Sequence, residues 1–114
     1  MSDKRPSRLA ELRARATVFA ALGDETRLSV LSKLLTGEQQ SIARLTEGTR
    51  LTRQAVTKHL RVLEDAGVVR STRVGRESLF EIEPRPIEDA RAYLDRIAQQ
   101  WDDALHRLKA FVED

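Results

Sequence analysis

The chain has 114 residues, which is enough for one domain with a modest core. It contains no cysteine, which excludes disulfides, thiol redox switching and thiolate metal sites. It has neither an apolar run long enough to cross a membrane nor a signal-peptide pattern, so we expect a soluble, cytoplasmic protein without a membrane partner.

The formal net charge of +2 conceals a segregation of charge along the chain. Residues 50–76 hold seven Lys or Arg against two acidic residues, whereas residues 77–114 hold five against ten. A positive segment of this kind provides affinity for phosphates and steers association with nucleic acid. The first fifteen residues are also basic, and we interpret them as a solvated terminus rather than a second backbone contact.

A first helix is predicted over about residues 7–21. It begins at Pro6 or Ser7, and Gly23 ends it. Its apolar positions recur at helical spacing and are Leu9, Leu12, Ala16 and Phe19.

Two shorter helices are expected to follow. Asp24 is placed to cap the first of them, which ends near Gly37. Its buried stripe is predicted to be Leu28, Leu31 and either Leu34 or Leu35. Ser41 begins a second, short helix that Gly48 ends, and residues 49–51 then form the turn of a helix-turn-helix.

Residues 52–66 are predicted to form one amphipathic helix, capped by Thr52 and ended by Gly67. One face carries apolar residues at core spacing, namely Val56, Leu60 and Leu63. The opposite stripe is almost entirely hydrogen-bond donors, namely Arg53, Gln54, Thr57, Lys58 and Arg61. Such donors suit the base-edge acceptors of the DNA major groove. A solvated basic face is the alternative interpretation.

Residues 68–83 are predicted to form a two-stranded hairpin. Two β-like runs, 68–73 and 78–82, flank a short turn that contains Gly75. Arg73 and Arg76 bracket this glycine, where cations suit a wing that grips phosphate or the minor groove. The fold class is therefore mainly α (α+β): a single winged helix-turn-helix domain spanning 1–114, with a two-stranded β-wing and long terminal helices.

A long last helix is predicted over about residues 87–112, started by Pro84 and Pro86. Its apolar residues follow a pattern close to a heptad seam. Packing against its own domain would cover part of this seam, and a homodimer formed with the first helix would cover the rest. The expected interface residues are Leu9, Leu12, Phe19, Leu94, Ile97, Trp101, Leu105 and Leu108.

Four motifs in order resemble the ArsR/SmtB family of bacterial transcriptional repressors. They are Phe19–Leu28 (FAALGDETRL), Leu51–Leu63 (LTRQAVTKHLRVL), Ala66–Val69 (AGVV) and Arg73–Arg76 (RVGR). The resemblance covers about residues 16–82, and the last helix lies where the family's last helix lies. It implies a homodimer on double-stranded DNA. Two-fold symmetry would place the recognition helices about 34 Å apart on a pseudo-palindromic operator.

We expect three kinds of DNA contact from this interpretation. The base-reading residues are predicted to be Arg53, Gln54, Thr57 and Lys58. The residues that position the helix on phosphates are predicted to be Thr52, His59 and Arg61. Arg73 and Arg76 are predicted to hold the flanking backbone or the minor groove.

The sequence contains no catalytic constellation, so an enzyme and a resident cofactor are not expected. Many family members respond to metals, but this chain lacks cysteine and paired histidines at ligand spacing, so no metal site is predicted. A weak metal sensor that uses carboxylates and His106 is one alternative. A winged-helix module that binds an acidic protein is another. An organic effector, a regulatory partner and no effector all remain open.

Overall fold

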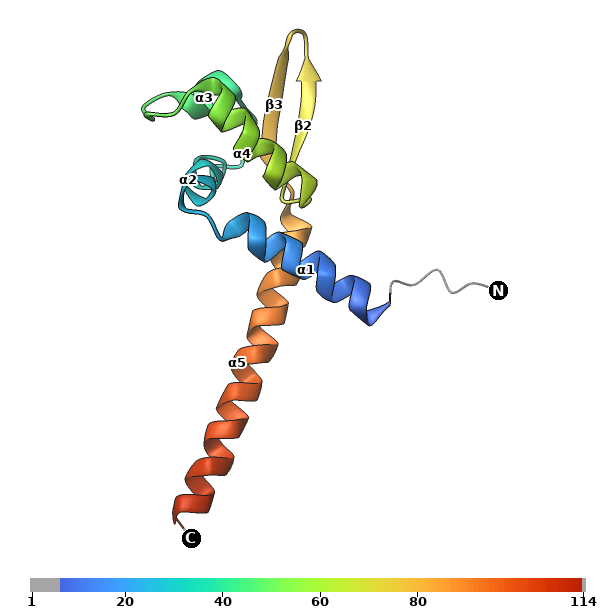
Figure 1. The fold of residues 1–114 in the computed structure, drawn as a ribbon, viewed down its shortest axis with the longest axis vertical. Coiled ribbons are helices and arrows are strands. Elements are labelled where there is room, and N and C mark those ends of the chain that lie inside the picture. The colour runs from blue at the N-terminus through green and yellow to red at the C-terminus, as the bar shows by residue number, and fades with distance from the viewer. Residues whose placement is uncertain (1–6, 114) are drawn as a thin grey trace, which may run out of the picture.

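The computed structural model describes residues 7–113 (Figure 1). The elements in chain order are α1 (Arg8–Leu22), α2 (Glu25–Lys33), β1 (Gln40–Ser41), α3 (Ile42–Thr46), α4 (Arg53–Asp65), β2 (Val69–Val74), β3 (Glu77–Ile82) and α5 (Pro84–Glu113). Helices α2–α4 and the β2–β3 hairpin gather at one end of the molecule, whereas α5 projects from them as a long rod crossed by α1. The mainly helical winged fold expected from the sequence is confirmed. No helix within residues 7–113 is long and apolar enough to cross a membrane.

The core lies between α1, α2, α3, α4 and the hairpin, and the first turns of α5 join it through Ala90. The three apolar residues predicted for the inner face of α4, Val56, Leu60 and Leu63, are completely buried. The prediction for α2 was partly wrong, because Leu28 is 47% exposed and Val30 is buried instead. The buried side of α2 is formed by Val30, Leu31 and the capping residue Leu34, which leaves Leu28 at the margin of the stripe.

At the junction of α1 and α2, side chains form hydrogen bonds with backbone N–H and C=O groups that have no partner within their own helix. The carboxylate of Asp24 accepts the backbone N–H of Arg27 at 2.9 Å, which caps α2 as predicted. The guanidinium of Arg27 reaches back to α1, where its Nε donates to the carbonyl of Ala21 at 2.7 Å. One short segment therefore satisfies donors of α2 and acceptors of α1 together.

The wing is part of a three-stranded antiparallel sheet with the order β1-β3-β2. The expected two-stranded wing was incomplete, because the two-residue strand β1 pairs Gln40 with Phe80 and Ser41 with Leu79. The hairpin strands also extend one residue nearer the turn on each side than predicted, with Val74 opposite Glu77. Strand β1 thereby ties the start of α3 to the base of the wing.

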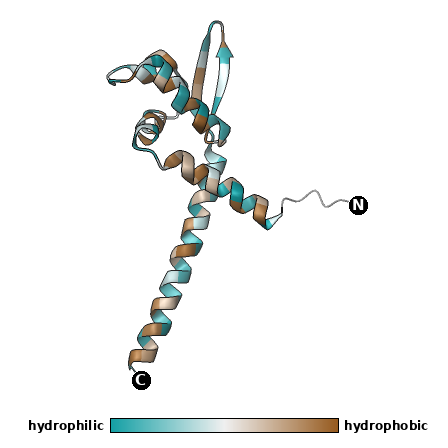
Figure 2. Ribbon diagram, in the orientation of Figure 1, coloured by the Kyte–Doolittle hydropathy of each residue, from teal (hydrophilic) through white to brown (hydrophobic). Residues whose placement is uncertain are grey.

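Helix α5 begins at Pro84, three residues before the predicted start. Proline is well suited to the first turn of a helix because the N–H it lacks has no intrahelical partner there. Ala90 is its only buried residue within the described chain. Figure 2 shows apolar residues recurring along the whole projecting rod. Most of the apolar seam of α5 is therefore uncovered in the isolated protomer.

Candidate nucleic-acid interface

The donor stripe of α4 is presented outward, as its spacing predicts. Arg53, Gln54, Lys58 and Arg61 are exposed. Thr57 is half-buried, and its hydroxyl donates to the carbonyl of Arg53 at 2.7 Å, so its hydroxyl hydrogen is already in use. Thr52 is the N-cap and accepts the backbone N–H of Ala55 at 3.0 Å. The stripe therefore belongs to a helix whose first turn is fixed by a cap.

The other end of α4 is fixed by Gly67 and the chain that follows it. Gly67 has a φ of 80°, and the next residue, Val68, donates its N–H to the carbonyl of Leu63 at 2.9 Å. This left-handed stop is the one predicted from the sequence, and it turns the chain directly into β2. The position of the wing therefore follows from the end of α4.

The turn between α3 and α4 is also held by specific bonds. The ammonium group of Lys33 donates to the carbonyls of Leu45 at 3.0 Å and Glu47 at 2.8 Å. The hydroxyl of Thr49 donates to the carbonyl of Thr46 at 2.6 Å. These bonds satisfy the free carbonyls at the end of α3 and fix the approach to α4.

A cleft of about 320 Å³ separates the start of α4 from the wing. It brings together Arg53 and Thr57 of α4 with Arg76 of the hairpin turn. Its remaining walls are Ser41, Ile42, Ala43, Glu77 and Ser78. The two-residue turn Gly75-Arg76 places Arg76 at the end of the hairpin, because Gly75 adopts a φ of 63°. Two of the predicted contact groups thus share one concave surface.

Arg73 lies on the strand side of the hairpin turn, next to the terminal pair of the hairpin, as the sequence predicts. It is in strand β2, opposite Ser78, and its Nε donates to the carbonyl of Gly75 at 3.4 Å. Side chains alternate across a strand, so Arg73 shares a face with Ser71, whose hydroxyl donates to Glu64 of α4. Arg73 therefore lies near the end of the wing, on the face of the hairpin that also carries Ser71.

Arg70 is a cation of the same strand that its surroundings neutralise. Its guanidinium contacts the carboxylates of Glu81 at 2.9 Å and Glu83 at 3.0 Å. The hydrogen bond to Glu81 raises the pKa of Arg70 above its ordinary value. The hydrogen bonds from Arg70 and then Gln39 lower the pKa of Glu81. Because α4 lies on the other face of the hairpin, this charge contributes little to the candidate interface.

His59 does not join the donor stripe. With 3.6 residues per turn, it lies roughly 170° around α4 from the stripe's centre. It is half-buried and near Asp24, whose pKa is lowered by the backbone hydrogen bond from Arg27 and, more weakly, by the charges of Arg27 and His59. The phosphate contact predicted for His59 therefore stays a prediction, and it would have to be made from a different side of α4 than the contacts of the donor stripe.

Several polar residues on this side of the molecule were not predicted as DNA contacts from the sequence. Ser41 and Ser78 line the cleft, and the exposed Arg44 and Arg50 lie on α3 and in the turn before α4. The positions of Ser41 and Ser78 depend on the pairing of β1 and β2 with β3, which periodicity alone does not give. The excess of cations in residues 50–76 did indicate Arg50.

The predicted dimer residues fall into two groups. Most are exposed on the protomer, from 42% at Leu12 to 64% at Trp101, and this group is Leu9, Leu12, Leu94, Ile97, Trp101, Leu105 and Leu108. Phe19 behaves differently, since it packs against the core and its ring centroid lies 6.1 Å from that of Tyr93. Phe19 joins α1 to α5 within one protomer, so less of its side chain is available to a partner, and its place in the dimer interface stays a prediction.

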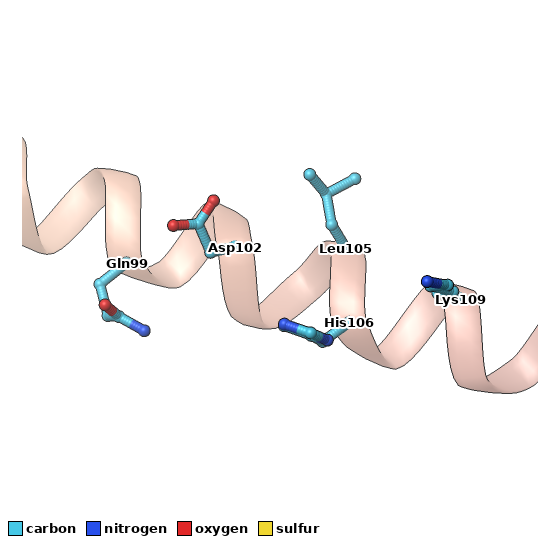
Figure 3. A pocket seen from close by; sticks show the side chains of 5 residues that line it. All are labelled: Gln99, Asp102, Leu105, His106 and Lys109. Carbon is cyan, nitrogen blue, oxygen red and sulfur yellow. The ribbon is translucent and has the colours of Figure 1, made fainter.

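The acidic and histidine side chains of α5 are not gathered into a cluster. Figure 3 shows a shallow hollow lined by Gln99, Asp102, Leu105, His106 and Lys109, all from this one helix. Asp102 and His106 lie one turn apart along this hollow, and its other lining residues are neither acidic nor histidine. Within residues 7–113, no three His, Cys, Asp or Glu side chains are close enough together to hold a metal ion.

Comparison with known proteins places these features in a wider group. A family model described as a helix-turn-helix domain matches residues 22–72. The chain is 37% identical over 78 residues to the uncharacterised HTH-type transcriptional regulator YuzN of Bacillus subtilis, covering 63% of this chain and 85% of that protein. It is 29% identical over 94 residues to the HTH-type transcriptional repressor SmtB of Mycobacterium tuberculosis, covering 82% and 67%. An ArsR-like transcriptional regulator from Rhodococcus sp. RHA1 superposes with a TM-score of 0.77 at 36% identity, covering 89% and 94%.

Proposed function

The chain belongs to the ArsR/SmtB family of winged helix-turn-helix transcriptional regulators, which are DNA-binding proteins and not enzymes, and we propose that it acts as a homodimeric repressor. It would act in the cytoplasm on a pseudo-palindromic operator in double-stranded DNA. The observation that carries this proposal is the cleft in which donors of α4 face Arg76 of the wing. Such a cleft suits a DNA backbone that passes between a helix in the major groove and a wing beside it.

The donor stripe supplies both kinds of DNA contact in this proposal. Arg53, Gln54 and Lys58 read base-edge acceptors, and the methyl group of Thr57 lies against a thymine methyl or a sugar. Thr52 and Arg61, at the two ends of the stripe, position α4 on phosphates. Arg73 and Arg76 hold the backbone that flanks the major groove. His59 is left out of the set because it lies on the other flank of α4.

A homodimer is proposed because the seam of α5 lacks a cover. From Leu94 to Val112, the large apolar side chains of this seam are 44–72% exposed in the protomer. Burial of apolar area at about 25 cal/mol per Å² makes covering such a seam strongly favourable. Two-fold pairing through α5 and the exposed leucines of α1 would present two copies of α4 about one DNA turn, roughly 34 Å, apart.

Titration of the purified protein onto the DNA upstream of its own gene tests this proposal. We expect saturable binding that resists nonspecific competitor, with one dimer on one two-fold site. The affinity should fall steeply between two salt concentrations because phosphate contacts release counterions. Added zinc should leave the affinity unchanged. Weak binding that is equal on every DNA would instead support the protein-interaction module, and release by zinc would support the metal sensor.

A further inference from the structure

Helices α1 and α5 cross away from the recognition helix (Figure 1), and a second group of arginines lines a groove between them. The groove there has a volume of about 470 Å³. The lining residues that matter for its chemistry are Arg8, Glu11, Arg15, Tyr93, Arg96 and Ile97. It combines three guanidinium groups, one carboxylate, an aromatic ring and an apolar wall.

Two of the guanidinium groups are held by Tyr93. The guanidinium carbon of Arg15 lies 4.9 Å from the ring centroid, and that of Arg96 lies 5.8 Å from it. The ring is itself held by Phe19, at a centroid distance of 6.1 Å. A guanidinium group that lies over a ring keeps the N–H donors at its edge free for an acceptor. The groove therefore presents oriented donors rather than freely moving cations.

These donors have few acceptors nearby. Glu11 is the one carboxylate in the lining of this groove. The ion pairs found among residues 7–113 involve Arg70 and Lys109, and none involves Arg15 or Arg96. A planar carboxylate is the acceptor that matches guanidinium donors best, since it accepts two parallel N–H bonds.

The lack of anions in the groove would make dimer formation less favourable. Leu12 and Ile97, on either side of the groove, are 42% and 44% exposed and belong to the proposed dimer surface. A partner seam that covers them would also remove water from Arg15 at the edge of the groove, whereas Arg96 lies roughly 145° around α5 from the centre of the seam. The carboxylates of Asp95 and Asp102 lie roughly 100° around α5 from the centre of that seam, so they are poorly placed to reach across. Guanidinium groups that lose water without a paired anion oppose association.

We propose that the groove between α1 and α5 binds a small aromatic carboxylate and that this binding tightens the dimer. The carboxylate would accept N–H donors of Arg15 and Arg96, and the ring would pack against Leu12 and Ile97. The effect on assembly rests on the proposed homodimer, whereas binding to the groove does not. An anion that binds the dimer better than the protomer must stabilise the dimer by the same factor.

Calorimetric titration of the full-length protein with benzoate tests binding, with benzamide as the neutral analogue at equal ionic strength. We expect benzoate to bind and benzamide to bind at least tenfold more weakly. Arg15→Gln and Arg96→Gln should each lower the benzoate affinity about tenfold or more, as expected for lost hydrogen bonds to a charged group. Arg107→Gln, which removes an exposed arginine of α5 outside the groove, is the matched control and should leave it unchanged. Equal binding of benzamide, or no binding of benzoate, would overturn the proposal.

Sedimentation at a series of protein concentrations tests the coupling. Benzoate should lower the dimer dissociation constant of the wild type and of Arg107→Gln, but not of Arg96→Gln. If benzoate has no effect and Asp102→Asn weakens the dimer as much as Arg96→Gln does, then a carboxylate of the partner fills the groove and the proposal is wrong. A protein that stays monomeric without benzoate would count against the proposed homodimer, and the calorimetric result would still decide on the groove.

Discussion

Arg70 and Arg76 belong to the same hairpin but have opposite electrostatic surroundings. Arg70 contacts the carboxylates of Glu81 and Glu83, whereas Arg76 lines the cleft beside Arg53 and Thr57. The count of seven cations in residues 50–76 therefore overstates the charge available to DNA. The slope of affinity against salt measures the cations that contact phosphates and so separates the two arginines.

Substitution Arg76→Ala should weaken binding to all DNA sequences alike and reduce the salt slope by about one charge. Arg70→Ala, on the face of the hairpin away from α4, is the matched control and should leave the slope unchanged. The measurement is the operator affinity of both variants over a range of salt concentrations. A slope that Arg76→Ala does not alter would remove the wing from the proposed interface.

Gln54 is the best candidate for reading a single base pair, because it is exposed and carries both a donor and an acceptor. Gln54→Ala should reduce discrimination at one position of the operator by about 1–3 kcal/mol and leave nonspecific binding unaltered. Affinities for operators changed at one base pair at a time provide the measurement. Gln99→Ala, on α5, serves as the control. A uniform loss on every sequence would give Gln54 a phosphate role instead.

Helical spacing and cap residues explain why much of the candidate site could be predicted from the sequence. The buried face of α4 and its outward stripe follow from a period of 3.6, and local side-chain bonds mark the first turn. The same period places His59 on the side of α4 away from the stripe, but the groups that surround it there depend on how the helices pack. The hydrogen-bond partners of Arg73 could not be obtained this way, because they depend on the pairing register of the hairpin.

Some helices and strands are determined by their own short stretch of sequence, whereas others depend on contacts with distant parts of the chain. The caps of α2, α3 and α4 are each bonded three residues along the chain, so a short window of sequence reveals them. Strand β1 has only two residues and exists because β3 lies beside it. The bonds from Arg27 to α1 are likewise invisible to periodicity, because they depend on how two helices meet.

The cap of α2 predicts how stability changes with acidity. The backbone hydrogen bond from Arg27, with weaker contributions from nearby cations, lowers the pKa of Asp24 below its ordinary value of 3.8. A lowered pKa in the folded state means that the carboxylate of Asp24 stabilises the fold at pH values above its ordinary pKa. That contribution is lost as the pH falls through the pKa of the folded state. Asn also caps helices well but does not titrate, so Asp24→Asn isolates the charge.

We therefore expect Asp24→Asn to be less stable than the wild type near neutral pH, and this difference should shrink as the pH falls below 3.8. Urea unfolding at a series of pH values measures it. Asp95→Asn removes a carboxylate from an exposed position of α5 and is the charge-matched control. A difference that stays constant with pH would mean that hydrogen-bond geometry, not charge, stabilises the cap.

The protomer is extended rather than compact, as expected for one subunit of an oligomer. Its radius of gyration is 18.9 Å, and its extents are 67 × 47 × 21 Å. A compact chain of this length would have a radius of gyration of about 13 Å. The difference is due to α5, which extends well beyond the helices and sheet that bury its first turns (Figure 1). Most of the stability of an amphipathic helix comes from packing of its apolar face, so a 30-residue helix with an exposed seam favours a partner that covers it.

Substitutions in that seam should separate folding from assembly. Ile97→Glu and Leu105→Glu place charges at side chains that are 44% and 45% exposed in the protomer, so the winged fold should remain intact. In a dimer the same charges would be buried without partners, which is costly, and the variants should sediment as monomers. His106→Glu introduces the same charge on another side of α5, and it should still form dimers.

The consequence for DNA follows from two-fold symmetry. A monomer contacts one half-site, so Ile97→Glu and Leu105→Glu should lose most of their operator affinity while their circular dichroism stays close to that of the wild type. Raising the protein concentration should restore little, because two charged seams repel each other. If either variant remained dimeric with full operator affinity, the dimer would have to form through a surface other than α5. The exposed seam would then need a different partner.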